Sequence, residues 1–268
     1  MDRPHYVHSD LFVYVTKNPN IIKNSQSPAE IIDKAFYAMM SELEELSNGQ
    51  VVVPTYNYQF TETKIFNLKH DASEVGQFSE LFRKKFINSR TNVPIFSNCT
   101  SFDGFFSTEP QKIIDPFGPS SDFDKLEQAN GVIVNYGSSF GPTFMIFIEK
   151  QVNGGAVYRY EKQFSGQLVG LNNTQSDVVL TNYVRPRQID IKYDLDKVEA
   201  DLLKQSILTK HTKPSGFSYS SFSARDFLEF ARNEIKRDPL YFLTKDTKEV
   251  LVGKGIFTKT DFDIKEFD

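Results

Sequence analysis

The sequence predicts an α/β fold: a central, mainly parallel or mixed sheet flanked by helices, with an antiparallel extension at about residues 156–195. In the first half, short apolar runs alternate with segments of helical periodicity, and after Gly155 apolar and polar residues alternate instead. No linker rich in Pro, Gly or Ser separates the halves. With 39% apolar residues in 268, the chain can bury a large core, and we expect a single domain over residues 1–268.

The first half begins with a well-defined helix and strand. Ser27 and Glu30 form a capping box, and apolar residues then recur at helical spacing up to Gly49, which suits a position just past the helix end. Residues 51–53 are all valine and precede Pro54, as in a short buried strand.

The remaining elements of this half follow the same alternation. A second capping box at residues 71–74 predicts a helix that continues to Phe86. Further strands are predicted at residues 6–8, 94–96 and 132–134, and a short helix at residues 123–128.

The second half reads differently. Residues 157–168 and 188–193 alternate apolar with polar side chains, which is typical of half-buried antiparallel strands. Residues 195–208 and 224–235 have helical spacing, and the tail is expected to be strand and turn.

Composition narrows the function classes. The formal charge of −4 is not gathered in blocks, which gives no reason to expect nucleic acid or an anionic membrane as partner. There is no secretory leader pattern and no apolar run of about 18 residues. The only cysteine, Cys99, rules out an internal disulfide. We therefore expect a cytoplasmic protein whose partners are small molecules, with a homodimer left open.

Several common kinds of site have no signature here. The four histidines, His5, His8, His70 and His211, include no pair at i, i+3 or i, i+4, so no helical metal site is predicted. GxSxG, P-loop and GxGxxG motifs are also missing from the sequence.

Polar residues follow the predicted strands. They are His8, Ser9 and Asp10 after the first strand, then Pro54-Thr55-Tyr56, Arg90-Thr91 and Ser97. Open α/β sheets bind ligands outside the carboxyl ends of their strands, so these clusters are expected to converge on one crevice.

Seven segments follow one another along the chain: YVHSDLF, VVVPTYNYQF, SEVGQFSELFRKK, RTNVPIFSN, DPFGPSSDFDKL, PTFMIFIE and YRYEKQFSG. Taken in this order, they resemble the aminoglycoside 3-N-acetyltransferase family. The resemblance runs from about residue 6 to residue 245, and it implies an acyl-coenzyme A-dependent enzyme that acts on amino groups of sugars.

The resemblance also implies a cofactor site without metal. It places five residues near acyl-coenzyme A, and among them an arginine can make bidentate contacts to phosphate. These residues are Ser9, Ser73, Arg90, Thr91 and Ser97.

The chain departs from the family at its general base. The family pattern Thr-x-x-His-x-x-Glu is matched by Thr143, Ile146 and Glu149, so an isoleucine stands where the family has histidine. Three residues at this spacing lie on one side of a helix. An amine on a sugar titrates near the range of an α-amino group, about 7.7 to 8.0, so a useful neutral fraction needs no strong base. We expect water, His8, Asp10 or Glu149 to receive the proton.

Substrate contacts are expected from Tyr56 and Tyr58, which can stack on a sugar or base, and from Ile146, which makes the pocket more apolar. The near balance of 35 acidic and 31 basic residues favours a nucleotide-linked aminodeoxyhexose of surface-glycan biosynthesis over a polycationic antibiotic. Three alternatives stay open: an aminoglycoside 3-N-acetyltransferase, a silent binding module, and an interaction subunit.

Overall fold

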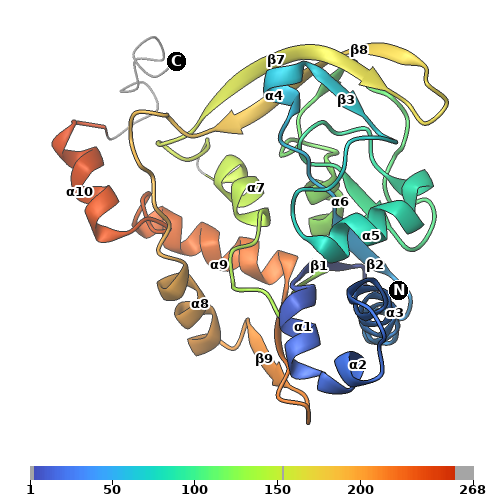
Figure 1. Cartoon of the computed structure of the whole chain (residues 1–268). Helices are drawn as coiled ribbons and strands as arrows, with labels where there is room; N and C mark the ends of the chain where they lie inside the picture. Colours follow the sequence, from blue (N-terminus) through green and yellow to red (C-terminus); the bar gives the residue numbers. More distant parts are fainter. Residues whose placement is uncertain (1–2, 153, 257–268) are drawn as a thin grey trace.

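The computed structural model describes residues 3–152 and 154–256. Its centre is a mixed six-stranded sheet in which β1 runs parallel to both neighbours, β2 and β6, while the outer strands are antiparallel (Figure 1). In spatial order the strands are β4 (Asn98–Thr100), β2 (Val51–Pro54), β1 (His5–Ser9), β6 (Val132–Tyr136), β10 (Ser218–Ser223) and β9 (Thr209–Thr212).

Helices cover both faces of this sheet. Neighbouring residues of β1 point to opposite faces: Val7 packs in a cluster with α1, α3 and α5, whereas Tyr6 packs in the larger cluster with α6, α7 and α9. The helices are α1 (Leu11–Lys17), α2 (Pro19–Lys23), α3 (Pro28–Ser47), α4 (Phe60–Thr63), α5 (Gln77–Lys85), α6 (Asp122–Gln128), α7 (Phe144–Gln151), α8 (Leu195–Lys204), α9 (Ala224–Arg237) and α10 (Lys245–Gly253).

A second sheet forms the extension. Its long antiparallel strands β7 and β8 cross the top of the molecule in Figure 1 and are flanked by the short strands β3 and β5. One hydrophobic cluster contains side chains of both sheets, such as Tyr6 and Leu180, and this shared core favours the single-domain prediction. The bounds are β3 (Ile65–Asn67), β7 (Tyr160–Val169), β8 (Gln175–Val184) and β5 (Ile113–Ile114).

The predicted fold class, a mixed sheet flanked by helices with an antiparallel extension, is confirmed. Several local predictions were wrong. Residues 94–96 form a turn with a single bridge at Ile95, and the strand follows it as β4. Residues 188–193 form no strand apart from a single bridge at Tyr193, and the strand that pairs with β7 is β8. The described tail contains the helix α10 instead of a strand.

The predicted capping box at residues 71–74 was also wrong. The helix begins only at Gln77, after Gly76 with φ of +122°, a conformation that favours glycine. Glu80 turns back to accept a hydrogen bond from the amide of Ser73 at 2.7 Å. The carboxylate that holds this loop therefore comes from Glu80, in the first turn of α5.

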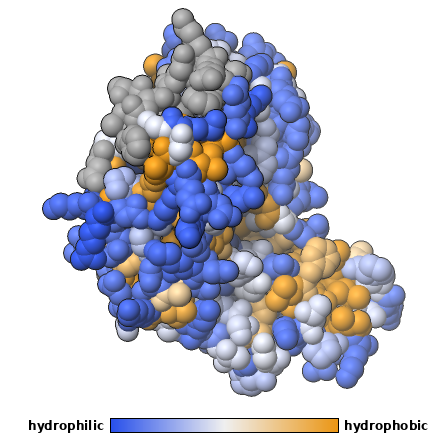
Figure 2. Space-filling view, turned by 90° about the vertical axis from the view of Figure 1, so that its left-hand side faces the viewer, coloured by the Kyte–Doolittle hydropathy of each residue, from blue (hydrophilic) through white to orange (hydrophobic). Residues whose placement is uncertain are grey.

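The surface carries hydrophilic residues over most of the face shown in Figure 2, with apolar residues in separate groups. In the described ranges no helix has the length and apolar character that crossing a bilayer requires.

Candidate functional site

The parallel strands β2, β1 and β6 end side by side, and a pocket opens at these ends. Because β1 lies between two parallel neighbours, this is the edge at which α/β sheets bind ligands. We call it the strand-end pocket. Its lining residues are His8, Ser9, Pro54, Tyr56, Tyr58, Val75, Ser79, Ser138, Ser139, Gly141 and Thr143.

A second hollow adjoins it and shares Ser138 and Ser139 with it. We call this hollow the serine pocket, because hydroxyl groups dominate its wall. The rest of its lining is Asn135, Phe140, Asp196, Glu199, Lys210, Thr212, Ser218, Tyr219 and Ser220.

In the described part of the chain four buried side-chain polar atoms have no hydrogen-bond partner: His8 Nε2, Ser9 Oγ, Ser73 Oγ and Asn135 Oδ1. His8 and Ser9 line the strand-end pocket and Asn135 lines the serine pocket, while Ser73 lies in the loop before α5. His8 and Asn135 face each other in the register of β1 and β6. Because each such group costs about 1 to 3 kcal/mol, their concentration at one edge marks a place built to meet polar atoms of a ligand.

His8 combines burial with a free ring nitrogen. Burial lowers the pKa of its imidazole to about 4, so the ring is neutral at neutral pH. The edge of Tyr6 packs against it with ring centroids 5.3 Å apart. A neutral imidazole with an unbonded Nε2 can accept a hydrogen bond or a proton from a group in the pocket.

The start of α5 faces the same pocket through Ser79. No side chain caps this helix, and a Cβ added to Gly76 would meet only the carbonyl oxygen of Ser9, at 3.8 Å. Uncapped amides and the helix dipole favour an anion at this point. Ser9 and Ser73 add hydroxyls that have no internal partner.

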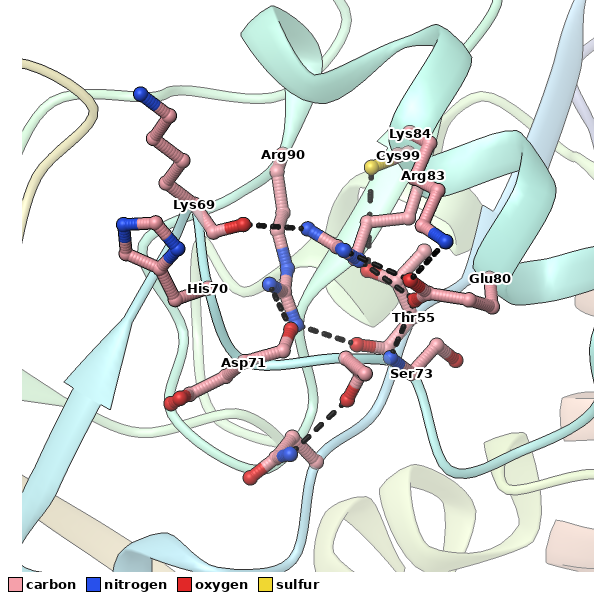
Figure 3. A network of polar contacts seen from close by, with 12 residues as sticks. Thr55, Lys69, His70, Asp71, Ser73, Glu80, Arg83, Lys84, Arg90 and Cys99 are labelled. Atoms are coloured by element: carbon pink, nitrogen blue, oxygen red, sulfur yellow. Dashed lines mark hydrogen bonds and ion pairs between the residues drawn. The ribbon is translucent and has the colours of Figure 1, made fainter.

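Arg90 lies in the interior, where its guanidinium is fully engaged (Figure 3). It donates to the carbonyl oxygens of Leu68 at 2.8 Å, Asp71 at 2.6 Å and Thr55 at 2.9 Å, and to Ser97 Oγ at 3.1 Å. Only 1% of the residue is exposed. Arg90 therefore joins the loop before α5 to the end of β2, and it does not line the strand-end pocket.

Thr91 and Ser97 belong to the same interior region. Ser97 Oγ donates to the carbonyl of Thr55 at 2.8 Å. Thr91 Oγ1 donates to Asp122 at 3.0 Å and accepts from the amide of Asn98 at 3.0 Å. Both hydroxyls are used by the protein itself, so the structure does not bring these two predicted cofactor contacts to the pocket.

The three residues of the family pattern on α7 reach different surroundings. Thr143 lines the strand-end pocket, as Tyr56 does. Ile146 packs, partly buried, against the large hydrophobic cluster. Glu149 is 1% exposed and accepts hydrogen bonds from Tyr158, Arg159 and Tyr193. The three side chains therefore do not share one site: Thr143 lies at the pocket, Ile146 lies against the hydrophobic core and Glu149 lies in the interior.

The carboxylate of Asp10 is also used within the protein itself. Its Oδ1 accepts from the amide of Val13 at 2.9 Å as the N-cap of α1. Of the residues predicted from sequence, the structure brings five together at the strand-end pocket, namely His8, Ser9, Tyr56, Tyr58 and Thr143.

Sequence reasoning missed Ser79, Ser138, Ser139 and Asn135. Ser138 and Ser139 follow the predicted strand at residues 132–134 and could have been found by the rule that selected His8 and Ser9. Ser79 lies within a helix and carries no local signal. In the described residues no group of three or more His, Cys, Asp or Glu could hold a metal ion.

Comparison with known proteins gives a family and a fold. The family model for aminoglycoside 3-N-acetyltransferases matches residues 31–236. No curated protein sequence matches the chain.

Three solved structures similar to this chain are distant from it in sequence. AAC-IIIb in a binary complex with CoASH has a TM-score of 0.65 at 10% identity, over 88% of this chain and 90% of that one. YokD from Bacillus subtilis has a TM-score of 0.59 at 14% identity, over 86% of this chain and 91% of that one. The apoenzyme of aminoglycoside acetyltransferase AAC(3)-IVa has a TM-score of 0.54 at 14% identity, over 90% of this chain and 85% of that one. At such identities the likeness establishes the fold.

Proposed function

The chain belongs to the aminoglycoside 3-N-acetyltransferase family, and from that premise we propose that it binds an acyl-coenzyme A at the strand-end pocket and transfers the acyl group to an amine of an amino sugar. The observation that carries the proposal is the gathering of unpartnered polar atoms, His8 Nε2 and Ser9 Oγ among them, where three parallel strands end.

The residues at the pocket suit coenzyme A. The pyrophosphate needs donors for negative charge, and the uncapped first turn of α5 offers backbone amides and the positive end of a helix dipole. The hydroxyls of Ser9 and Ser73 supply neutral donors beside it. The solved structure of the similar AAC-IIIb, with CoASH bound, supports this cofactor. Arg90 contributes indirectly, because it holds the loop that carries Ser73 and leads into α5.

The transfer itself needs one bond made and one broken. The amine nitrogen attacks the thioester carbonyl carbon, the C–N bond forms, the C–S bond breaks and coenzyme A leaves as thiolate. The proton from nitrogen passes to His8 Nε2 or to water, and it finally neutralises the thiolate. A weakly basic imidazole is sufficient here, because nitrogen in the tetrahedral adduct is far more acidic than in the starting ammonium. Orientation against the thioester supplies much of the remaining acceleration, about 7 to 11 kcal/mol.

The charges of the two pockets favour an acceptor with a single amine. The lining of the strand-end pocket includes no Asp or Glu. In the serine pocket Asp196 and Glu199 are opposed by Lys210, whose Nζ lies 3.2 Å from Glu199. One net negative charge suits one ammonium, the serine hydroxyls suit sugar hydroxyls, and Lys210 suits a phosphate. We propose a nucleotide-linked aminodeoxyhexose.

A second candidate substrate is an aminoglycoside. The family model carries this name, and Asp196 and Glu199 are carboxylates of the kind that attract a polycation.

Thiol release from acetyl-coenzyme A tests these proposals. Nucleotide-linked aminodeoxyhexoses, gentamicin and apramycin are compared as acceptors, and coenzyme A binding is measured in parallel by calorimetry. We expect binding and preferential turnover of the nucleotide-linked sugars. Preferential turnover of the antibiotics would select the second candidate. Tight binding without turnover of any amine would identify a silent binding module, and failure to bind coenzyme A would refute the proposed function.

A further inference from the structure

We propose that Asn135 is a specificity-determining residue: its side-chain oxygen and the ring nitrogen of His8 together accept the two hydrogens of a primary amine, and this pair selects an amine over a hydroxyl as acyl acceptor. This role rests on the proposed function of the two pockets. Asn135 is 1% exposed and lines the serine pocket, and its Oδ1 has no hydrogen-bond partner. A buried oxygen without a partner is costly, so its presence at a pocket wall indicates a donor that a ligand supplies.

The two acceptors come from neighbouring parallel strands. His8 of β1 and Asn135 of β6 are paired in the register of the sheet, and residues paired in this way project from the same face, about 4.8 Å apart. Two atoms that each accept from one tetrahedral nitrogen at about 2.9 Å are themselves about 4.7 Å apart. The spacing of the strands therefore matches the spacing that the two N–H groups of one amine require.

The pair lies where the two pockets meet. His8 lines the strand-end pocket, Asn135 lines the serine pocket, and Ser138 and Ser139 line both. An amine held between His8 and Asn135 therefore has its sugar on the side of the serine pocket and the thioester on the side of the strand-end pocket. Its lone pair is free to attack the thioester carbonyl, because two acceptors do not compete for it.

Ser220 sets the orientation of the Asn135 amide. Asn135 Nδ2 donates to Ser220 Oγ at 3.1 Å, and the register of β6 and β10 pairs the same two residues. The nitrogen end of the amide thus points to β10, and the oxygen end is turned away from it. Ser220 is therefore a positioning residue, which keeps an acceptor rather than a donor available to the amine.

A hydroxyl acceptor satisfies only one member of the pair. It has a single proton, so either His8 Nε2 or Asn135 Oδ1 stays buried without a donor, and a lone pair of the hydroxyl faces that acceptor. A site built to hydrogen-bond a substrate group rejects an analogue that lacks the group, because the polar atoms of the site are left unpaired. The pair therefore favours transfer to nitrogen over transfer to oxygen.

Binding of two matched compounds tests the pair without turnover. They are a nucleotide-linked aminodeoxyhexose and the same nucleotide sugar with a hydroxyl in place of the amine, and calorimetry measures both dissociation constants at about pH 9, where the amine is mostly neutral. We expect the parent to prefer the amine at least tenfold, and Asn135→Leu to bring the two constants within about threefold of each other. Asn135→Asp keeps an acceptor at this position and should retain the preference. An unchanged preference in Asn135→Leu, or its loss in Asn135→Asp, would overturn the proposal.

Ser220→Ala and Ser221→Ala test how the amide is oriented. Ser220→Ala frees the amide to turn its NH2 group toward the ligand, so the preference for the amine should fall about threefold or more. Ser221, the next residue of β10, points to the opposite face and bonds to His211 Nε2 at 3.1 Å. Ser221→Ala also loses one hydrogen bond but should keep the preference of the parent. Equal effects of the two variants would refute the role of Ser220.

The stability of the free protein is a readout that a structural role would move the other way. Asn135→Leu removes an oxygen that has no partner, so the midpoint of urea unfolding should stay equal or rise. Asn57→Leu is the matched control, because Asn57 is 5% exposed and uses both ends of its amide, toward Ala72 at 2.9 Å and Gln59 at 3.1 Å. Its midpoint should fall. An equal fall for Asn135→Leu would make Asn135 a structural residue and overturn the proposal.

Thiol release from acetyl-coenzyme A is measured with the same preparation. A binding preference for the amine without turnover of any amine would support the pair and refute the proposed acyl transfer. Turnover of gentamicin without binding of either nucleotide sugar would support acyl transfer and overturn the role of Asn135.

Discussion

Glu149 accepts a hydrogen bond from Arg159 Nε at 2.6 Å, and both side chains lie in the interior with at most 5% exposed. Two tyrosine hydroxyls complete the site, Tyr158 at 2.6 Å and Tyr193 at 2.7 Å. The carboxylate at the Glu position of the family pattern therefore has both oxygens occupied. Removing only one member of a buried ion pair strongly destabilises a protein, because the other charge stays buried without a partner.

Replacing Glu149 by alanine should destabilise the protein by about 3 to 5 kcal/mol, because Arg159 is left as a buried charge without its partner. Urea unfolding measures the change. The double variant Glu149→Leu with Arg159→Met should recover much of the loss. If Glu149→Ala keeps full stability but loses turnover, Glu149 has the catalytic role that the family pattern implies.

Restoring the family histidine should not restore a base. Ile146 packs against the hydrophobic cluster, and Glu149, one turn away, has no oxygen free to orient an imidazole. We expect Ile146→His to leave kcat within about threefold and to cost about 1 to 3 kcal/mol of stability, since an imidazole is buried without a partner. Ile146→Val controls for the altered volume. A rise in turnover of a hundredfold or more would show that the pocket can still use a base at this position.

His8 should make stability depend on pH. Its pKa is 6.5 in the reference state and about 4 in the folded protein, where burial disfavours the charged ring. Between these values the unfolded state binds more protons, so the free energy of unfolding decreases as pH falls from 6.5 toward 4, by about 3 kcal/mol in full. His8→Gln should flatten this part of the profile. The exposed His70 provides the control, and a His70→Gln variant should follow the parent curve.

Arg90→Lys should show whether Arg90 stabilises the fold through its internal hydrogen bonds or binds a phosphate of coenzyme A directly. Lysine keeps the charge but cannot span the carbonyls of Leu68, Asp71 and Thr55 at once. We expect a loss of about 3 kcal/mol in unfolding free energy, since charged hydrogen bonds are worth about 1.5 to 3 kcal/mol each. Arg187→Lys, at an exposed arginine, should change nothing. Weaker coenzyme A binding at unchanged stability would favour direct contact by Arg90 instead.

Ser9→Ala and Ser73→Ala should each leave the stability of the protein equal or higher and weaken its binding of coenzyme A. Each removes a buried hydroxyl that has no partner in the free protein, so stability should stay equal or rise slightly. Affinity for coenzyme A should fall by about 1 kcal/mol or more per hydroxyl, as measured by calorimetry. Ser47→Ala removes a buried hydroxyl that donates to the carbonyl of Leu43 at 2.7 Å, and it should lose stability without affecting affinity. Unchanged affinity in both test variants would place coenzyme A elsewhere.

The sequence by itself determined the class of fold and the edge of the sheet at which to look. Hydrophobic periodicity and the capping box at Ser27 are local, and α3 and β2 formed where they were predicted. His8 and Ser9 follow directly from the rule that ligands bind beyond the ends of parallel strands. The resemblance to the family was likewise carried by short segments in order.

Only the tertiary structure decided what each polar residue does. Arg90, Thr91, Ser97 and Glu149 occupy positions that match the family, but their hydrogen bonds are made to groups distant in sequence, such as Thr55, and local patterns carry no information about these partners. Asp122 lies in the segment DPFGPSSDFDKL, but its side-chain donors Thr91 and Asn98 come from another part of the chain. The direction of a hydrogen bond depends on every neighbour that competes for the proton, and those neighbours are known only once the chain has folded.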